Sequence, residues 1–316
     1  MRPTTRHPTS WHEPLARRCR CMVTAAAWLA AVAAVAPCPA NEASKERDGE
    51  RFVRLARDSR GKPLALESAI VRFVPTTVQE GGPTVDLVAA VHVAEKSYYR
   101  RLNQLFKGYD AVLYEMVAPA GVDLAERIPA DSSHPVSLLQ RGMTRVLELE
   151  FQLNGIDYSA RNFVHADMTA EQFAETMRQR GESMLQIFFR MFWHALAEQA
   201  GTTGDTDVRL LMALFSRDRA LALKRVLAEQ VEDMEGSLQA IEGPKGSTLI
   251  SERNKVALEV LRKRLASGDR RVAIFFGAAH MPDLARRLRK GFQLKPSTTR
   301  WLVAWELTGK KAPPGD

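Results

Sequence analysis

The chain has 316 residues, of which 45% are hydrophobic and 26% are charged, and its formal net charge is +8. This is the composition of an ordinary globular protein, long enough to bury a substantial core in one large domain or two small ones. The first forty residues carry five arginines and one glutamate, so the rest of the chain has a net charge of only +4. Such a mild excess argues against a nucleic-acid partner.

Residues 1–40 have the pattern of a secretory signal peptide. Arginines precede an apolar run from Cys21 to Ala36, and small residues lead to a cleavage site after Ala40. The run is short for a transmembrane span, although an uncleaved segment is the alternative and would be the only link to a membrane. We therefore expect a secreted or periplasmic protein with a single domain over residues 41–316.

Loss of this segment limits the possible chemistry. All three cysteines, Cys19, Cys21 and Cys38, lie within it. The remaining chain therefore has no thiolate nucleophile, cysteine metal cluster or disulfide.

Residues 41–118 are predicted to form a first β-α-β half. Two short alternating runs, from Arg51 and from Ala65, flank the turn sequence SRGKP and predict an opening β-hairpin. A strand over Val85–Val93, a helix over Glu95–Phe106 and a strand over Ala111–Val117 follow.

Residues 136–266 show helical periodicity and are predicted to be a large helical insertion. His194 inside this region and His134 just before it are not expected to belong to a functional site. His134 precedes a proline in a turn, and His194 lies in an apolar helix.

The polar segment Gly155–Phe173 inside this region has two interpretations. It forms either a loop that supplies His165 or Asp167 to a metal or substrate, or the start of a helix capped by Asp167 or Thr169. The cap is the favoured role for Thr169.

Residues 270–308 repeat the strand-helix-strand pattern, and residues 309–316 are predicted to be a disordered tail. Aligning the two units by histidine places AAVH, ending at His92, over GAAH, ending at His280. A glutamate follows an aromatic residue 23 positions after the first histidine and 26 after the second, at Glu115 and Glu306. We therefore predict an α/β fold with a duplicated β-α-β core sheet and the helical insertion between its halves.

Ligands of open α/β sheets bind at the carboxyl ends of the strands, so these residues are expected to face one site. Two histidines with Glu115, and more weakly Glu306, suit divalent metal binding or general acid-base hydrolysis. A structural, hydrogen-bonded histidine is the plainer alternative. A buried glutamate is harder to explain in that way, because an unpartnered carboxylate is costly to bury.

A polar pair interrupts the apolar stripe of the helix predicted over residues 247–266. Asn254 occupies a stripe position between Ile250 and Ala257, and Arg253 lies beside it. Arg253 is expected either to stabilise a developing oxyanion, while Asn254 orients a ligand or the substrate, or to pair with a core carboxylate and hold the helix against the sheet.

The motif order AAVH, YEM, SERN and GAAH resembles the TraB/GumN group of the Tiki superfamily, which includes erythromycin-esterase-like and ChaN-like proteins. The resemblance extends over roughly residues 51–307, with Ala89 at a position where the family usually has glycine. Carried over by motif, it marks five site residues: His92, Glu115, Arg253, Asn254 and His280.

The resemblance implies a metal-dependent hydrolase acting outside the cytoplasm on a peptide or small-molecule substrate, with peptide bonds as the expected target. His92, Glu115 and His280 are the expected ligands of a divalent metal such as manganese, cobalt or zinc. Two alternatives stay open: a metal-independent ester hydrolase, and a non-catalytic protein that sequesters a peptide or small ligand.

Overall fold

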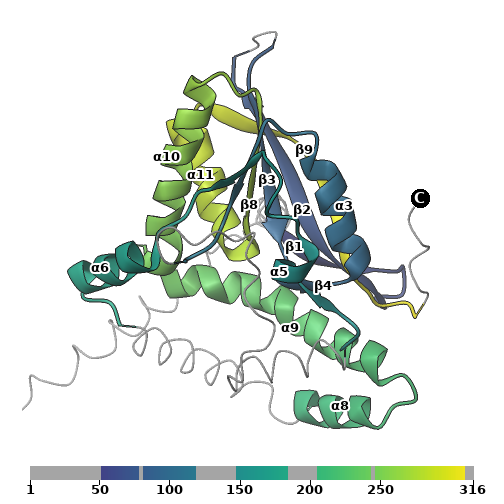
Figure 1. Cartoon of the computed structure of the whole chain (residues 1–316). Helices are drawn as coiled ribbons and strands as arrows, with labels where there is room; N and C mark the ends of the chain where they lie inside the picture. Colours follow the sequence, from purple (N-terminus) through teal and green to yellow (C-terminus); the bar gives the residue numbers. More distant parts are fainter. Residues whose placement is uncertain (1–50, 78–80, 119–146, 184–204, 243–245, 310–316) are drawn as a thin grey trace, which may run out of the picture. The chain divides into compact units, whose positions relative to one another are not determined.

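The computed structural model describes residues 51–77, 81–118, 147–183, 205–242 and 246–309 (Figure 1). All of these belong to one compact unit, Glu50–Asp316. The predicted signal peptide, His134, His194 and nearly all of the predicted tail lie outside the described residues.

A seven-stranded sheet forms the centre of this unit, in the order β1-β2-β3-β8-β5-β7, with β9 also paired to β2. The strands β3, β8, β5 and β7 are parallel, whereas β2 is antiparallel to β1, β3 and β9. The predicted α/β class and the opening hairpin are therefore confirmed. The strands are β1 (Val53–Arg57), β2 (Pro63–Pro75), β3 (Thr84–Ala90), β5 (Ala111–Tyr114), β7 (Phe163–His165), β8 (Arg271–Gly277) and β9 (Leu294–Glu306).

Helices cover both faces of the sheet, as the apolar sequence of β8 requires. Ala273 and Phe275 of β8 belong to the core beneath α3 (Lys96–Phe106), whereas Ile274 and Phe276 belong to the core beneath α10 (Arg253–Ala266) and α11 (Met281–Gly291). Successive side chains of a strand point to opposite faces, so one strand supplies both cores. Figure 1 shows α3 on one side of the sheet, and α10 and α11 on the other.

The other elements surround one end of the sheet. A separate two-stranded ladder joins β4 to β6, and the long helix α9 crosses below the sheet in Figure 1. Across the residues described, none of the helices combines the length and apolarity needed to cross a membrane. These elements are β4 (Val93–Ala94), β6 (Glu150–Phe151), α5 (Gln152–Gly155), α6 (Ala170–Arg180), α8 (Asp205–Leu214), α9 (Arg219–Glu242), the π-helical turn η1 (Thr248–Glu252) and the 3-10 turn η2 (Ala278–His280).

The region between β5 and β8 differs from the predicted helical insertion. It contains strand β7, which extends the main sheet beside β5, and strand β6, which pairs with β4. The large helical insertion predicted over residues 136–266 is therefore not confirmed, because two strands lie among its helices. Helical periodicity missed these strands because each has only two or three residues.

Both predicted strand-helix-strand units are present, as β3-α3-β5 and β8-α11-β9. Their final strands occupy unlike places, since β5 pairs in parallel with β8 and β9 pairs antiparallel with β2. The internal duplication stays a prediction.

Candidate functional site

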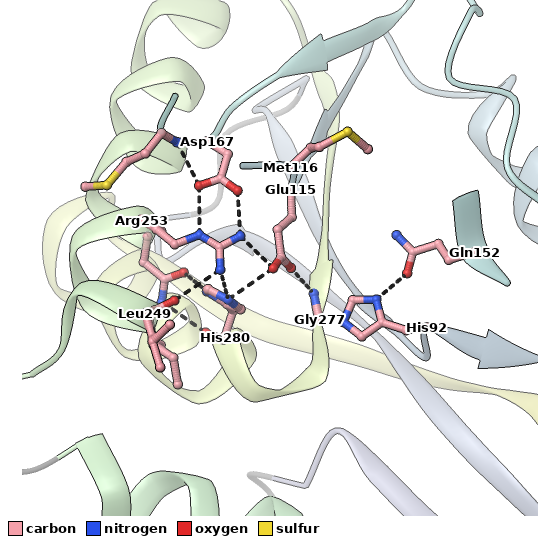
Figure 2. Close-up of polar contacts among 12 residues, drawn as sticks. His92, Glu115, Met116, Gln152, Asp167, Leu249, Arg253, Gly277 and His280 are labelled. Carbon is pink, nitrogen blue, oxygen red and sulfur yellow. Dashed lines mark hydrogen bonds and ion pairs between the residues drawn. The ribbon is translucent and has the colours of Figure 1, made fainter. Parts of the chain in front are cut away.

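Four neighbouring parallel strands end at the same edge of the sheet, and each is followed by a polar side chain. His92 comes two residues after β3, Glu115 directly after β5, Asp167 two residues after β7 and His280 three residues after β8. This is the edge at which α/β proteins bind ligands. Because β3 and β8 pair directly, the two histidine-bearing strands are neighbours. Figure 2 shows Glu115 between the Arg253 guanidinium on one side and Gly277 and His92 on the other.

Glu115 is held as a carboxylate by the groups around it. Its Oε2 accepts a hydrogen bond from the Gly277 backbone N–H at 2.6 Å, and its Oε1 accepts one from Arg253 Nη2 at 2.7 Å. Burial by itself would raise the pKa of Glu115, but His280, the Arg253 charge and the Gly277 N–H outweigh it and hold the pKa well below its ordinary value. Glu115 therefore supplies a fixed negative charge rather than a proton.

The guanidinium of Arg253 has no spare donor. Its Nε and Nη2 bind the two carboxylate oxygens of Asp167 at 2.9 and 2.6 Å, and Nη2 also binds Glu115. Its Nη1 donates to the Leu249 carbonyl at 3.2 Å and lies 3.5 Å from His280 Nε2. Since an arginine has five N–H donors, this arrangement favours the second predicted role, in which Arg253 pairs with core carboxylates and fastens α10 to the sheet.

His280 is buried, and its orientation is set by Asn254. Its Nδ1 lies 2.7 Å from Asn254 Oδ1, while Asn254 Nδ2 donates to the His280 carbonyl at 3.2 Å and to Asp283 at 2.9 Å. With the amide nitrogen so engaged, Oδ1 must accept, which places a proton on Nδ1. The Nε2 atom faces Arg253 and lies 3.5 Å from Glu115 Oε1.

His92, by contrast, is exposed. Its Nδ1 lies 2.9 Å from Gln152 Oε1, and its Nε2 faces the Glu115 carboxylate across Gly277. A Cβ placed on Gly277 would lie 3.1 Å from His92 Nε2 and 3.3 Å from Glu115 Oε2, so these two atoms are at most about 6.4 Å apart. Both imidazoles of the predicted pair therefore face one carboxylate, and the glycine makes room for it.

Two weaker candidates are not brought to this cluster. His165 is exposed, and its Nε2 lies 2.6 Å from the Met116 carbonyl. Glu306 ends β9, which β2 and β3 separate from β8, and its carboxylate accepts hydrogen bonds from Thr308.

Two roles were predicted for the segment Gly155–Phe173, and Asp167 and Thr169 each take one of them. Thr169 caps α6 in a capping box with Gln172. The Asp167 side chain is fully buried against Arg253, so it belongs to the site through the arginine and not as a cap.

Gln152 and Tyr158 are site residues that the sequence did not reveal as such. Gln152 holds the His92 imidazole, and its Nε2 donates to the Tyr158 hydroxyl at 2.9 Å. Tyr158 was part of a segment recognised as a candidate loop over the site. A lone glutamine in EFQLNG carries no comparable signal.

The arrangement of the expected metal ligands does not suit a divalent cation. Both oxygens of Glu115 already accept strong hydrogen bonds, and the positive guanidinium of Arg253 lies 3.5 Å from His280 Nε2, where it opposes a second cation. In the part of the chain that the structure describes, no group of three or more His, Cys, Asp or Glu side chains is placed to hold a metal ion. A bound metal stays a prediction.

Comparisons of the chain with protein-family models, with curated proteins and with solved structures found no match.

Proposed function

We propose that the protein is a hydrolase in which His92 activates water beside the Glu115 carboxylate. The observation that carries the proposal is the contrast between the two imidazoles. His280 Nε2 is buried against Arg253, whereas His92 is exposed and directs its Nε2 toward an ionised carboxylate. An accessible imidazole near a fixed negative charge is suited to general-base catalysis.

The reaction follows from these positions. His92 Nε2 removes a proton from a water molecule as the water oxygen attacks the substrate carbonyl carbon. The imidazolium that forms is stabilised by Glu115, whose lowered pKa keeps it charged throughout. His92 then returns the proton to the leaving group as the bond between the carbonyl carbon and that group breaks.

The arrangement favours esters or lactones over peptide bonds. Cleavage of an amide demands stronger stabilisation of the oxyanion than cleavage of an ester, and the donors of Arg253 are already engaged by Asp167, Glu115 and Leu249. The resemblance to a superfamily with erythromycin-esterase-like members supports the same choice. The expected peptidase activity remains a competing outcome of the test.

The test compares hydrolysis of p-nitrophenyl esters, lactones and fluorogenic peptides by the wild-type protein, His92→Ala and the exposed control His165→Ala. Each is assayed after EDTA treatment and again with manganese, cobalt or zinc. We expect ester or lactone turnover that survives chelation, is retained in His165→Ala and falls roughly 10²- to 10⁴-fold in His92→Ala.

Two outcomes would overturn this proposal. Peptide cleavage that disappears with EDTA and returns with a metal would establish the metal-dependent peptidase instead. No turnover of any substrate would remove the hydrolase and favour a binding protein.

We also propose that the hydrolase acts outside the cytoplasm, as a secreted or periplasmic protein. The arginine-flanked apolar run and the small residues before Asn41 support this localisation.

A further inference from the structure

Among the residues that the structure describes, Gln152 is the one hydrogen-bond partner of the His92 imidazole. The Gln152 backbone N–H donates to the His92 carbonyl at 2.8 Å, and its side-chain Oε1 lies 2.9 Å from His92 Nδ1. Gln152 is buried although its partner is exposed. The backbone bond persists when the side chain is changed, so side-chain substitutions act on the imidazole without releasing the chain.

The Gln152 amide is placed with its nitrogen toward Tyr158 and its oxygen toward His92. The amide nitrogen donates to the Tyr158 hydroxyl at 2.9 Å, which leaves Oε1 to accept from His92 Nδ1. Burial raises the pKa of Tyr158 to about 12, even though the Gln152 hydrogen bond lowers it. The phenol therefore stays neutral in any assay near neutral pH.

The Gln152–Tyr158 pair is itself held firmly. The Tyr158 ring packs against Tyr114 and Phe163, with centroid separations of 5.1 and 5.7 Å. Asn103 of α3 donates to the Gly155 carbonyl at 2.8 Å and accepts from the Asp157 N–H at 3.1 Å, which fastens the turn that carries the pair.

We infer that Gln152 is a positioning residue of the active site. Its carbonyl keeps the proton of His92 on Nδ1, and the tautomer so defined leaves Nε2 unprotonated toward Glu115. Asn254 holds His280 through the same carboxamide-to-Nδ1 contact, at 2.7 Å. A neutral amide suits this task because it orients the ring without adding charge. The inference rests on the proposed role of His92 as the base.

The test uses Gln152→Met, Gln152→Glu and Tyr158→Phe, with Gln179→Met as the matched control on the exposed face of α6. Long-range ¹H–¹⁵N spectra of histidine-labelled protein, assigned with His92→Ala, report which ring nitrogen of His92 carries the proton. We expect the Nδ1–H form in the wild type and in Gln179→Met, and a shift toward Nε2–H in Gln152→Met.

Turnover provides the second readout. In Gln152→Met, kcat should fall on the order of 10²-fold with little change in KM, as for a misplaced catalytic group. In Gln152→Glu, the acid limb of the kcat/KM profile should move to higher pH, because the new carboxylate stabilises the protonated ring. If Gln152 were purely structural, its substitution would lower stability without moving the acid limb of the kcat/KM profile.

The inference can fail in two ways. A wild-type His92 protonated on Nε2, or an unchanged tautomer and unchanged kcat in Gln152→Met, would overturn it. If Gln152→Met fails to fold, Tyr158→Phe serves in its place and should shift the tautomer in the same direction by a smaller amount. If the wild type hydrolyses no substrate, the proposed function fails, whereas the NMR result still decides the tautomer.

Discussion

Replacing Arg253 with methionine tests whether this side chain holds the site together. The Asp167 side chain is fully buried and would keep one contact, the Met168 N–H at 2.7 Å. Glu115 would lose its contact with Arg253 as well, and would keep the Gly277 N–H. Removing one partner of a buried ion pair costs about 3–5 kcal/mol, a large part of the roughly 5–15 kcal/mol that stabilises a typical protein.

At about 2–4 °C per kcal/mol for a domain of this size, the midpoint of thermal unfolding should fall by roughly 6–20 °C. Arg253→Lys should lose less, because lysine keeps the charge but not the planar fork that binds both oxygens of Asp167. Adding Asp167→Leu to Arg253→Met should recover part of the loss, since it removes the unpaired buried carboxylate.

The assay is urea unfolding at pH 7 followed by circular dichroism, with Arg100→Met on the exposed surface of α3 as the control. Surface substitutions of this kind usually change stability by no more than about 0.5 kcal/mol. An Arg253→Met variant within that range of the wild type would refute the holding role. So would a double variant that is less stable than Arg253→Met alone.

Three further predictions concern Glu115, Gly277 and Gly155. The stability that ionised Glu115 contributes is present above its ordinary pKa of 4.5 and is lost as the pH falls toward its lowered pKa. The difference in unfolding free energy between the wild type and Glu115→Gln should therefore shrink in acid. A difference independent of pH would contradict this. Gly277→Ala places a methyl group 3.1 Å from His92 Nε2, so kcat/KM should fall while the exposed imidazole moves aside at little cost in stability. Unaltered turnover would show that the space left by Gly277 between His92 and Glu115 is not needed. Gly155→Ala would put a Cβ 2.4 Å from the Tyr99 ring and should cost about 1–3 kcal/mol, and a variant with wild-type stability would mean that α5 moves freely.

The central part of the site could be predicted because it depends on strand ends. Two apolar runs lead to His92 and His280, and a glutamate follows a buried strand. Because parallel strands share one carboxyl edge, these positions are enough to predict one site. The pairing of β3 with β8 then brings the two histidines together. The polar pair Arg253–Asn254 was recognisable because it interrupts an apolar helical stripe.

The rest depended on contacts that the sequence does not display. Gln152 reaches His92 across 60 positions and Arg253 reaches Asp167 across 86, and nothing local marks either pair. Glu306 resembled Glu115 in its neighbours along the chain, but strand order placed it on β9, with β2 and β3 between it and β8. Similar local sequence therefore did not lead to a similar position in the sheet.

The exported state has its own check. Mass spectrometry of secreted or periplasmic material should find an N-terminus close to Asn41, whereas recovery of only full-length, membrane-bound chain would favour an uncleaved anchor.

The most direct measurement of the central claim is the ratio of ester kcat/KM between the wild type and His92→Ala, both treated with EDTA. If His92 is the base beside Glu115, the wild type should stay active and exceed the variant by at least about 10²-fold. Equal activity in the two proteins, or complete loss of wild-type activity on chelation with recovery on adding metal, would contradict the mechanism.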